Sequence, residues 1–185
     1  MAFKTTHARR LAGPALMLVM IGFAGCGSLG SKPPDDAFDD GNKTWQEVAV
    51  NLPAMPQPAN LLPFDVSAIT TQRFAVDEKS LTLGADGVVR YTLVGVSPSG
   101  VKNVSYEGIR CESREQKIYA LGHDDGTWSQ ARRSEWQPIL SNAVNRQQAA
   151  LAQDYFCAGR TIVGNASDMV RRLRRHDTIT SDLTR

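Results

Sequence analysis

The chain has 185 residues, of which 42% are hydrophobic and 22% charged, and its formal net charge is +2. This ordinary composition excludes a collagen, a coiled coil, a polytopic membrane protein and a wholly disordered chain. The length suits one domain with a tail.

The first 25 residues have the pattern of a signal peptide. Lys4, Arg9 and Arg10 form a positive start, and residues 11–24 follow without a charge. This apolar run is shorter than the roughly 20 residues of a membrane span and fits the core of a secretory signal. We therefore expect residues 1–25 to direct export by the general secretory route.

The signal ends in Phe23-Ala24-Gly25-Cys26, which resembles a bacterial lipobox. In such a sequence the cysteine thiol takes a diacylglycerol and becomes the mature N-terminus, and its acyl chains anchor the protein. Because Gly27 rather than Asp follows Cys26, the outer membrane is favoured over the inner membrane. The alternative is a plain secretory signal that leaves Cys26 as an unmodified thiol.

The other two cysteines, Cys111 and Cys157, are expected to form a disulfide, because an even pair in an oxidising compartment usually does so. The chain-entropy model gives such a bond roughly 4 kcal/mol. The alternative is a pair of buried thiols. No Cys-x-x-Cys motif is present, so we expect neither a metal site nor a cofactor.

The segment 26–43 contains Gly, Ser, a Pro-Pro pair and four aspartates, and it is predicted to be a flexible acidic tether. Residues 44–176 are expected to form the domain and 177–185 a disordered tail. Without residues 1–25 the chain has 18 Lys and Arg against 19 Asp and Glu, a net charge of −1. Such a neutral domain gives no reason to expect nucleic acid as a partner.

The centre of the domain has the pattern of an antiparallel β-meander. Residues 45–52 alternate loosely and are predicted as a first strand, and the proline-rich stretch 53–63 should run extended over the domain. Four further strands are predicted. Turns rich in Gly, Asp and Ser lie between strands at 84–87 and 97–100, and another follows the last strand at 123–126. These strands are residues 74–83, 88–96, 103–111 and 116–121.

Helical patterns follow the strands. Residues 141–156 are rich in Ala and Gln and should form a helix that ends at Cys157. A last helix is predicted over 166–175, capped by Asn165 or Ser167. The expected fold class is therefore α+β, a single domain in which an antiparallel β-meander sheet is packed by a C-terminal helix.

The last helix has a basic face, formed by Arg171, Arg172, Arg174 and Arg175. This face could contact anionic phospholipid headgroups or an acidic partner. The alternative is a solvated face on a docked terminal helix.

A second candidate surface consists of Arg90, Tyr106, Glu107 and Arg110, with Glu107 as an acid or base. Strand alternation places Ser105 and Glu107 on one face, and Tyr106 and Arg110 on the other. Cross-strand ion pairs and hydrogen bonds on a half-solvated sheet are the alternative interpretation.

Two runs resemble a known family: Asp86-Gly87-Val88-Val89-Arg90-Tyr91-Thr92-Leu93, and Ser105-Tyr106-Glu107-Gly108-Ile109-Arg110-Cys111. They are similar to the CNP-like (cryptic neisserial protein-like) family of exported proteobacterial lipoproteins, whose activity is unassigned. The similarity covers residues 45–157. It implies an envelope location and assigns no catalytic residue.

These observations favour an outer-membrane lipoprotein that faces the periplasm and acts as a non-enzymatic binding module. The lipid anchor attaches it to the membrane, and an envelope protein, peptidoglycan or phospholipid is the expected partner. A periplasmic hydrolase that uses Tyr106, Glu107 and Arg110 is the alternative. Ser105, His123 and Asp124 or Asp125 contain the residue types of a catalytic triad, but no nucleophile-elbow motif supports one.

Overall fold

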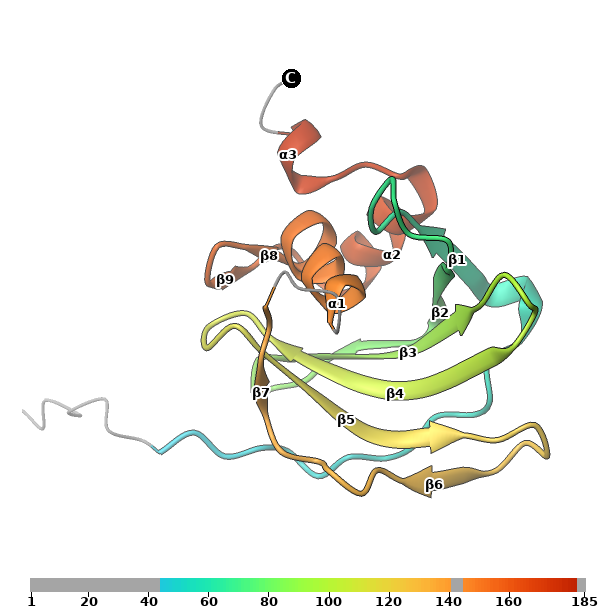
Figure 1. Ribbon diagram of the computed structural model, residues 1–185. Helices are drawn as coiled ribbons and strands as arrows, with labels where there is room; N and C mark the ends of the chain where they lie inside the picture. The colour runs from blue at the N-terminus through green and yellow to red at the C-terminus, as the bar shows by residue number, and fades with distance from the viewer. Residues whose placement is uncertain (1–43, 141–144, 183–185) are drawn as a thin grey trace, which may run out of the picture. The chain divides into compact units, whose positions relative to one another are not determined.

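The computed structural model describes residues 44–140 and 145–182, which belong to one compact unit beginning at Thr44 (Figure 1). The predicted signal peptide, the predicted lipidation site Cys26 and the predicted tether lie outside the described residues.

An antiparallel sheet forms one layer of the domain, and its strands follow in the order β1-β2-β3-β4-β5-β6, with β7 also paired to β5. Each of β1 to β6 pairs with the next along the chain, which confirms the predicted meander. The strands are β1 (Leu61–Phe64), β2 (Arg73–Leu83), β3 (Val88–Val96), β4 (Lys102–Arg110), β5 (Glu115–Gly122), β6 (Trp128–Gln130) and β7 (Gln137–Pro138).

Three tight turns connect these strands where the sequence predicted them. In the first, the Gly87 N–H donates to the Gly84 carbonyl at 3.0 Å, and in the last, the Gly126 N–H donates to His123 at the same distance. Gly87 and Gly126 have φ values of 74° and 84°, a region that glycine enters without steric cost. The turn chemistry therefore sets the consecutive pairing of the strands.

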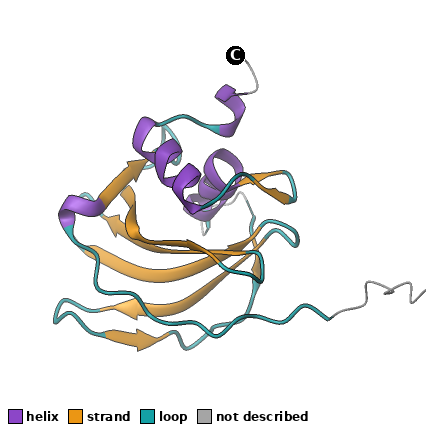
Figure 2. Cartoon of the chain, turned by 180° about the vertical axis from the view of Figure 1, so that it is seen from behind, coloured by secondary structure: helices purple, strands orange, loops and turns teal. Residues whose placement is uncertain are grey.

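Helices cover one face of the sheet (Figures 1 and 2). Helix α1 (Arg146–Ala150) continues directly into a π-helical turn (Leu151–Phe156), and the short hairpin of β8 (Cys157–Ala158) and β9 (Thr161–Ile162) follows. Helix α2 (Ala166–Arg175) lies beyond it, and α3 (Ile179–Asp182) follows α2. The α+β class predicted from the sequence is confirmed.

Helix α2 begins and ends as its sequence predicts. The Asn165 side chain accepts from the Asp168 N–H at 3.2 Å, and the Asp168 carboxylate accepts from the Asn165 N–H at 3.0 Å. This reciprocal capping box satisfies two backbone donors that the helix would otherwise leave unpaired. On the face of α2 that packs into the main core, Met169 and Leu173 are fully buried.

The main core lies between the sheet and the helices. Tyr91 and Ile109 of the sheet have no exposed surface, and neither have Leu151 and Phe156 of the π-helical turn. The rings of Tyr91 and Phe156 pack at 5.5 Å between centroids. Because each large side chain contributes about 1.5–3 kcal/mol on burial, this contact layer holds the helices to the sheet.

The predicted disulfide joins Cys111, directly after β4, to Cys157, at the end of the π-helical turn. The two residues are 46 positions apart in sequence, and their Cα atoms are 5.6 Å apart. Both are buried, at 2% and 6% exposure. The bond therefore ties the helical layer to the end of a central strand.

Two sequence predictions are wrong. Residues 45–52 are not a strand, because they cross the face of the sheet and bond to the carbonyl and carboxylate of Asp86 and to side chains of β5 instead of pairing at an edge. The predicted tail 177–185 contains α3, whose Ile179 is only 8% exposed. A single apolar residue in a short polar stretch was too weak a pattern to predict this helix.

Replacing Cys111 and Cys157 together by Ala should lower the free energy of unfolding by roughly 4 kcal/mol, because the unfolded chain gains the loop entropy that the bond removes. Urea denaturation of the wild type and the double variant measures the difference. A reducing agent should shift the wild type alone. Alkylation of both thiols in native, unreduced protein would contradict the bond.

Candidate functional site

The four residues of the predicted binding surface do not share one face. Arg90, Tyr106 and Arg110 lie on the outer face of the sheet, away from the helices, whereas Glu107 points to the helical side. The alternation predicted for β4 is correct, but it separates Glu107 from the other three residues. A hydrolase site that combines Tyr106, Glu107 and Arg110 therefore cannot form.

The outer face is covered by the N-terminal segment, residues 44–57. The Trp45 indole N–H donates to the Asp86 carbonyl at 2.8 Å, and the Val48 N–H donates to the Asp86 carboxylate at 2.9 Å. Glu47 accepts from Lys117 at 2.8 Å and from the Tyr119 hydroxyl at 2.6 Å. These contacts attach the segment to the turn between β2 and β3 and to β5.

Arg90 and Arg110 serve this attachment. Arg90 forms an ion pair with Asp86 at 2.6 Å, and its side chain is only 7% exposed. The Arg110 guanidinium lies 3.7 Å from the centre of the Trp45 ring, a cation–π contact. Tyr106 is 4% exposed and packs against Tyr119 and Trp128. The three residues therefore hold the sheet and the N-terminal segment together, and only Arg110 also lines smaller pockets, beside Cys111 and beside Glu112.

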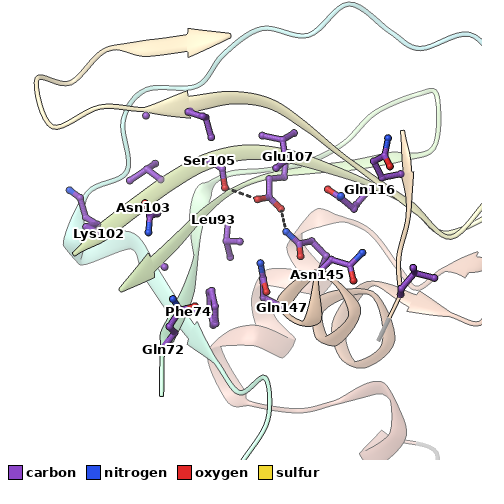
Figure 3. A pocket seen from close by; sticks show the side chains of 18 of the residues that line it. Gln72, Phe74, Leu93, Lys102, Asn103, Ser105, Glu107, Gln116, Asn145 and Gln147 are labelled. Atoms are coloured by element: carbon purple, nitrogen blue, oxygen red, sulfur yellow. Dashed lines mark hydrogen bonds between the residues drawn. The ribbon is translucent and has the colours of Figure 1, made fainter. Parts of the chain in front are cut away.

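The pocket on the helical side has a volume of about 710 Å³ and lies between the sheet and α1 (Figure 3). We call it the Glu107 pocket. Side-chain amides dominate its polar lining, together with one carboxylate, one lysine and one histidine. The polar residues that line it are Gln72, Lys102, Asn103, Ser105, Glu107, Gln116, His123, Gln137, Asn145, Gln147 and Gln148.

Glu107 is the buried acid of this pocket, with only 2% of its surface exposed. Its Oε1 accepts from Ser105 at 2.6 Å, and its Oε2 accepts from Gln148 at 3.0 Å and from Tyr91 at 3.1 Å. Burial raises the pKa of Glu107, although these three hydrogen bonds oppose the shift. No cation among the described residues forms an ion pair with this carboxyl group.

Three amide oxygens of the lining have no hydrogen-bond donor within the described ranges: those of Gln116, Asn145 and Gln148. Two of these amides have a defined orientation. Asn145 donates through Nδ2 to the Pro138 carbonyl at 3.0 Å, and Gln148 donates through Nε2 to Glu107. A buried acceptor without a donor costs about 1–3 kcal/mol. The pocket therefore has a defined deficit of donors next to a carboxyl group.

The residue types of a catalytic triad are not assembled. His123 Nε2 lies 2.7 Å from the Ser129 hydroxyl, and Asp125 accepts from Thr127. Ser105, in contrast, donates to Glu107. His123 and Asp125 therefore belong to the turn before β6 and do not form a catalytic triad with Ser105.

The basic residues of α2 do not form one uniform face. Arg171 pairs with Asp168 on the same helix, and Arg174 pairs with Glu78 of β2. Arg172 turns inward and donates to the Val163 carbonyl at 3.3 Å. Arg175 is exposed. Arg171 and Arg174 of the predicted basic face are thus each paired with a carboxylate of the domain.

Sequence reasoning did not single out Asn145 and Gln148 as lining residues of the pocket, or Tyr91 as a hydrogen-bond donor to Glu107. The only sequence signal was a polar amide on a helix rich in Ala, a pattern equally typical of an exposed face.

No helix in the described part of the chain has the length and apolar content to cross a membrane. Among residues 44–140 and 145–182, no cluster of His, Cys, Asp and Glu is arranged to hold a metal ion.

The fold and pocket define an α+β domain with a meander sheet and a buried acid. A model of the CNP1-like family matches residues 40–174, and the chain belongs to this family. The match continues past Cys157 into α2, farther than the resemblance apparent in the sequence. No curated protein and no solved structure matches the chain.

Acid should weaken the attachment of the N-terminal segment. Burial acts to raise the pKa of Asp86, but hydrogen bonds from Arg90, Val48 and Val88 outweigh it and lower the pKa from 3.8 to about 2. A lowered folded-state pKa stabilises the protein above 3.8, and this stability is lost as the pH falls towards about 2.

Asp86→Asn should cost roughly 3 kcal/mol near neutral pH, because it leaves the Arg90 guanidinium without its closest anion. Urea denaturation measures the free energy of unfolding of the wild type and of Asp86→Asn across the acid range. The difference between the two should shrink as the pH falls below 3.8. Asp124→Asn, in an exposed turn, is the control. A difference that stays constant with pH would contradict the assignment.

Glu107 should have the opposite pH dependence. Because its folded pKa lies above 4.5, the free energy of unfolding should rise as the pH falls from the raised pKa towards 4.5. Glu107→Gln removes the titrating group and should abolish that rise, and Gln148 can rotate its amide to accept from the new Gln. The control is Glu112→Gln, whose side chain is 81% exposed. Thermal melting across this range measures both variants.

Proposed function

We propose that this protein is an outer-membrane lipoprotein that faces the periplasm and binds peptidoglycan fragments in the Glu107 pocket without cleaving them. The signal sequence, the Cys26 lipobox and the family resemblance support the envelope location. The observation that carries the binding function is the amide-rich pocket of about 710 Å³.

The pocket suits this ligand chemistry in three ways. Its volume lies within the range of about 300–1,000 Å³ that is usual for small-molecule sites. Its Gln and Asn side chains can donate to and accept from sugar hydroxyls and peptide amides. Leu93 and Phe74 supply an apolar wall on which a sugar or a side chain can pack.

The bonding of Glu107 supports binding over catalysis. The Glu107 carboxyl group is held by three neutral donors and keeps one acceptor position for a donor of the ligand, as a binding group needs. Tyr106 and Arg110, the other members of the hydrolase hypothesis, lie on the opposite face of the sheet.

Soluble fragments from lysozyme-digested peptidoglycan should bind the domain, as measured by isothermal titration calorimetry. Gln147→Trp adds bulk to the wall of the pocket and should weaken binding at least about tenfold. Gln130→Trp is the matched control, because Gln130 lies on β6 and does not line this pocket.

Absence of binding, or equal weakening by the two Trp variants, would overturn the proposal. Chromatography of the fragments after incubation separates binding from catalysis. New cleavage products that Glu107→Gln abolishes would favour a hydrolase.

A further inference from the structure

We propose that the Glu107 pocket recognises its ligand through a primary ammonium group, held beside Glu107 and the amide oxygens of Gln148 and Asn145. This inference rests on the proposed function and names the part of the fragment that the pocket selects.

The carboxyl group of Glu107 is unusual because it is buried without a cation. All three of its partners, Ser105, Gln148 and Tyr91, are neutral donors. An ionised carboxylate has about four acceptor positions, so one position is left for a further donor. A cation there would also supply the charge that the described residues do not.

Each of the two neighbouring amides presents an oxygen that lacks a donor among the described residues. The Nε2 of Gln148 is used by Glu107, and the Nδ2 of Asn145 is used by the Pro138 carbonyl. Because both nitrogens donate to oxygen atoms, neither amide can be reversed without placing two oxygens in contact. Their own oxygens therefore stay as acceptors, and neither has a donor in the described part of the chain.

A buried carboxyl group without a cation, beside amide oxygens that lack donors, suits a group that carries positive charge and several donors. A primary ammonium has three donors and no acceptor, so it can pair with Glu107 and donate to a neighbouring amide oxygen. A ligand carboxylate at this position would instead be repelled by the Glu107 carboxylate. The remaining volume accepts the larger body of a molecule that carries the amine.

Lys102 lies at the other end of the pocket and does not supply this cation. It is exposed and precedes Glu107 by five positions on β4, which corresponds to roughly 17 Å along an antiparallel strand. Figure 3 shows Lys102 at one end of the pocket, away from Glu107. Glu107, which holds the ammonium group in this proposal, is thus separate from the exposed Lys102.

The test compares two preparations of the same peptidoglycan fragments, one with its primary amines intact and one with them acetylated. Acetylation removes the charge and two of the donors. Wild-type protein should bind the intact preparation at least about tenfold more tightly in calorimetry. Glu107→Gln should reduce the affinity for intact fragments to that for acetylated fragments, and Glu112→Gln should leave the preference unchanged.

The outcomes separate this inference from the proposed function. Equal affinity for both preparations would overturn amine recognition and leave fragment binding standing, whereas no binding of either preparation would overturn both. A preference for amines that persists in Glu107→Gln would place the amine elsewhere and overturn the inference. The wild-type comparison needs no variant, so it remains decisive even if Glu107→Gln does not fold.

Discussion

The structure depends on the need to cover both faces of the sheet. The first seven residues of β3, Val88 to Val94, are all buried, although successive side chains of a strand point to opposite faces. One face is covered by α1, the π-helical turn and α2, and the other by the N-terminal segment. That segment therefore acts as a layer of the fold, and the ion pair of Asp86 with Arg90 attaches it.

The two covers have different chemistry, and this difference places the pocket. The outer cover is attached by charged and aromatic side chains, and the pocket beneath it, of about 510 Å³, is lined by Glu47, Lys117 and Tyr119. The inner cover is a short helical layer, and it leaves a polar cavity where α1 meets β4. The disulfide fixes the π-helical turn to the end of β4, and through it sets where Gln148 meets Glu107. One covalent bond and one polar network thus position the same helix.

Several elements could be predicted because their signals are local. The turn at Gly84–Gly87, the β-branched run of β3 and the capping residue of α2 each lie within a few neighbouring residues. The disulfide followed from the compartment and the number of cysteines. The strand predicted for residues 45–52 was wrong. Loose alternation is typical of a strand, but an unpaired segment attached by its side chains shows a similar pattern.

By itself, the sequence indicated consecutive antiparallel strands, the capped helix α2 and the expectation of an exported, lipid-anchored protein. It also indicated Glu107 as a residue of interest. Strand alternation also separated Glu107 from Tyr106 and Arg110, but only the tertiary structure brought Gln148 to Glu107 across 41 positions of sequence. The physical reason is that strand and helix periodicity depend on neighbouring residues, whereas the partners of a buried carboxyl group depend on how distant segments pack.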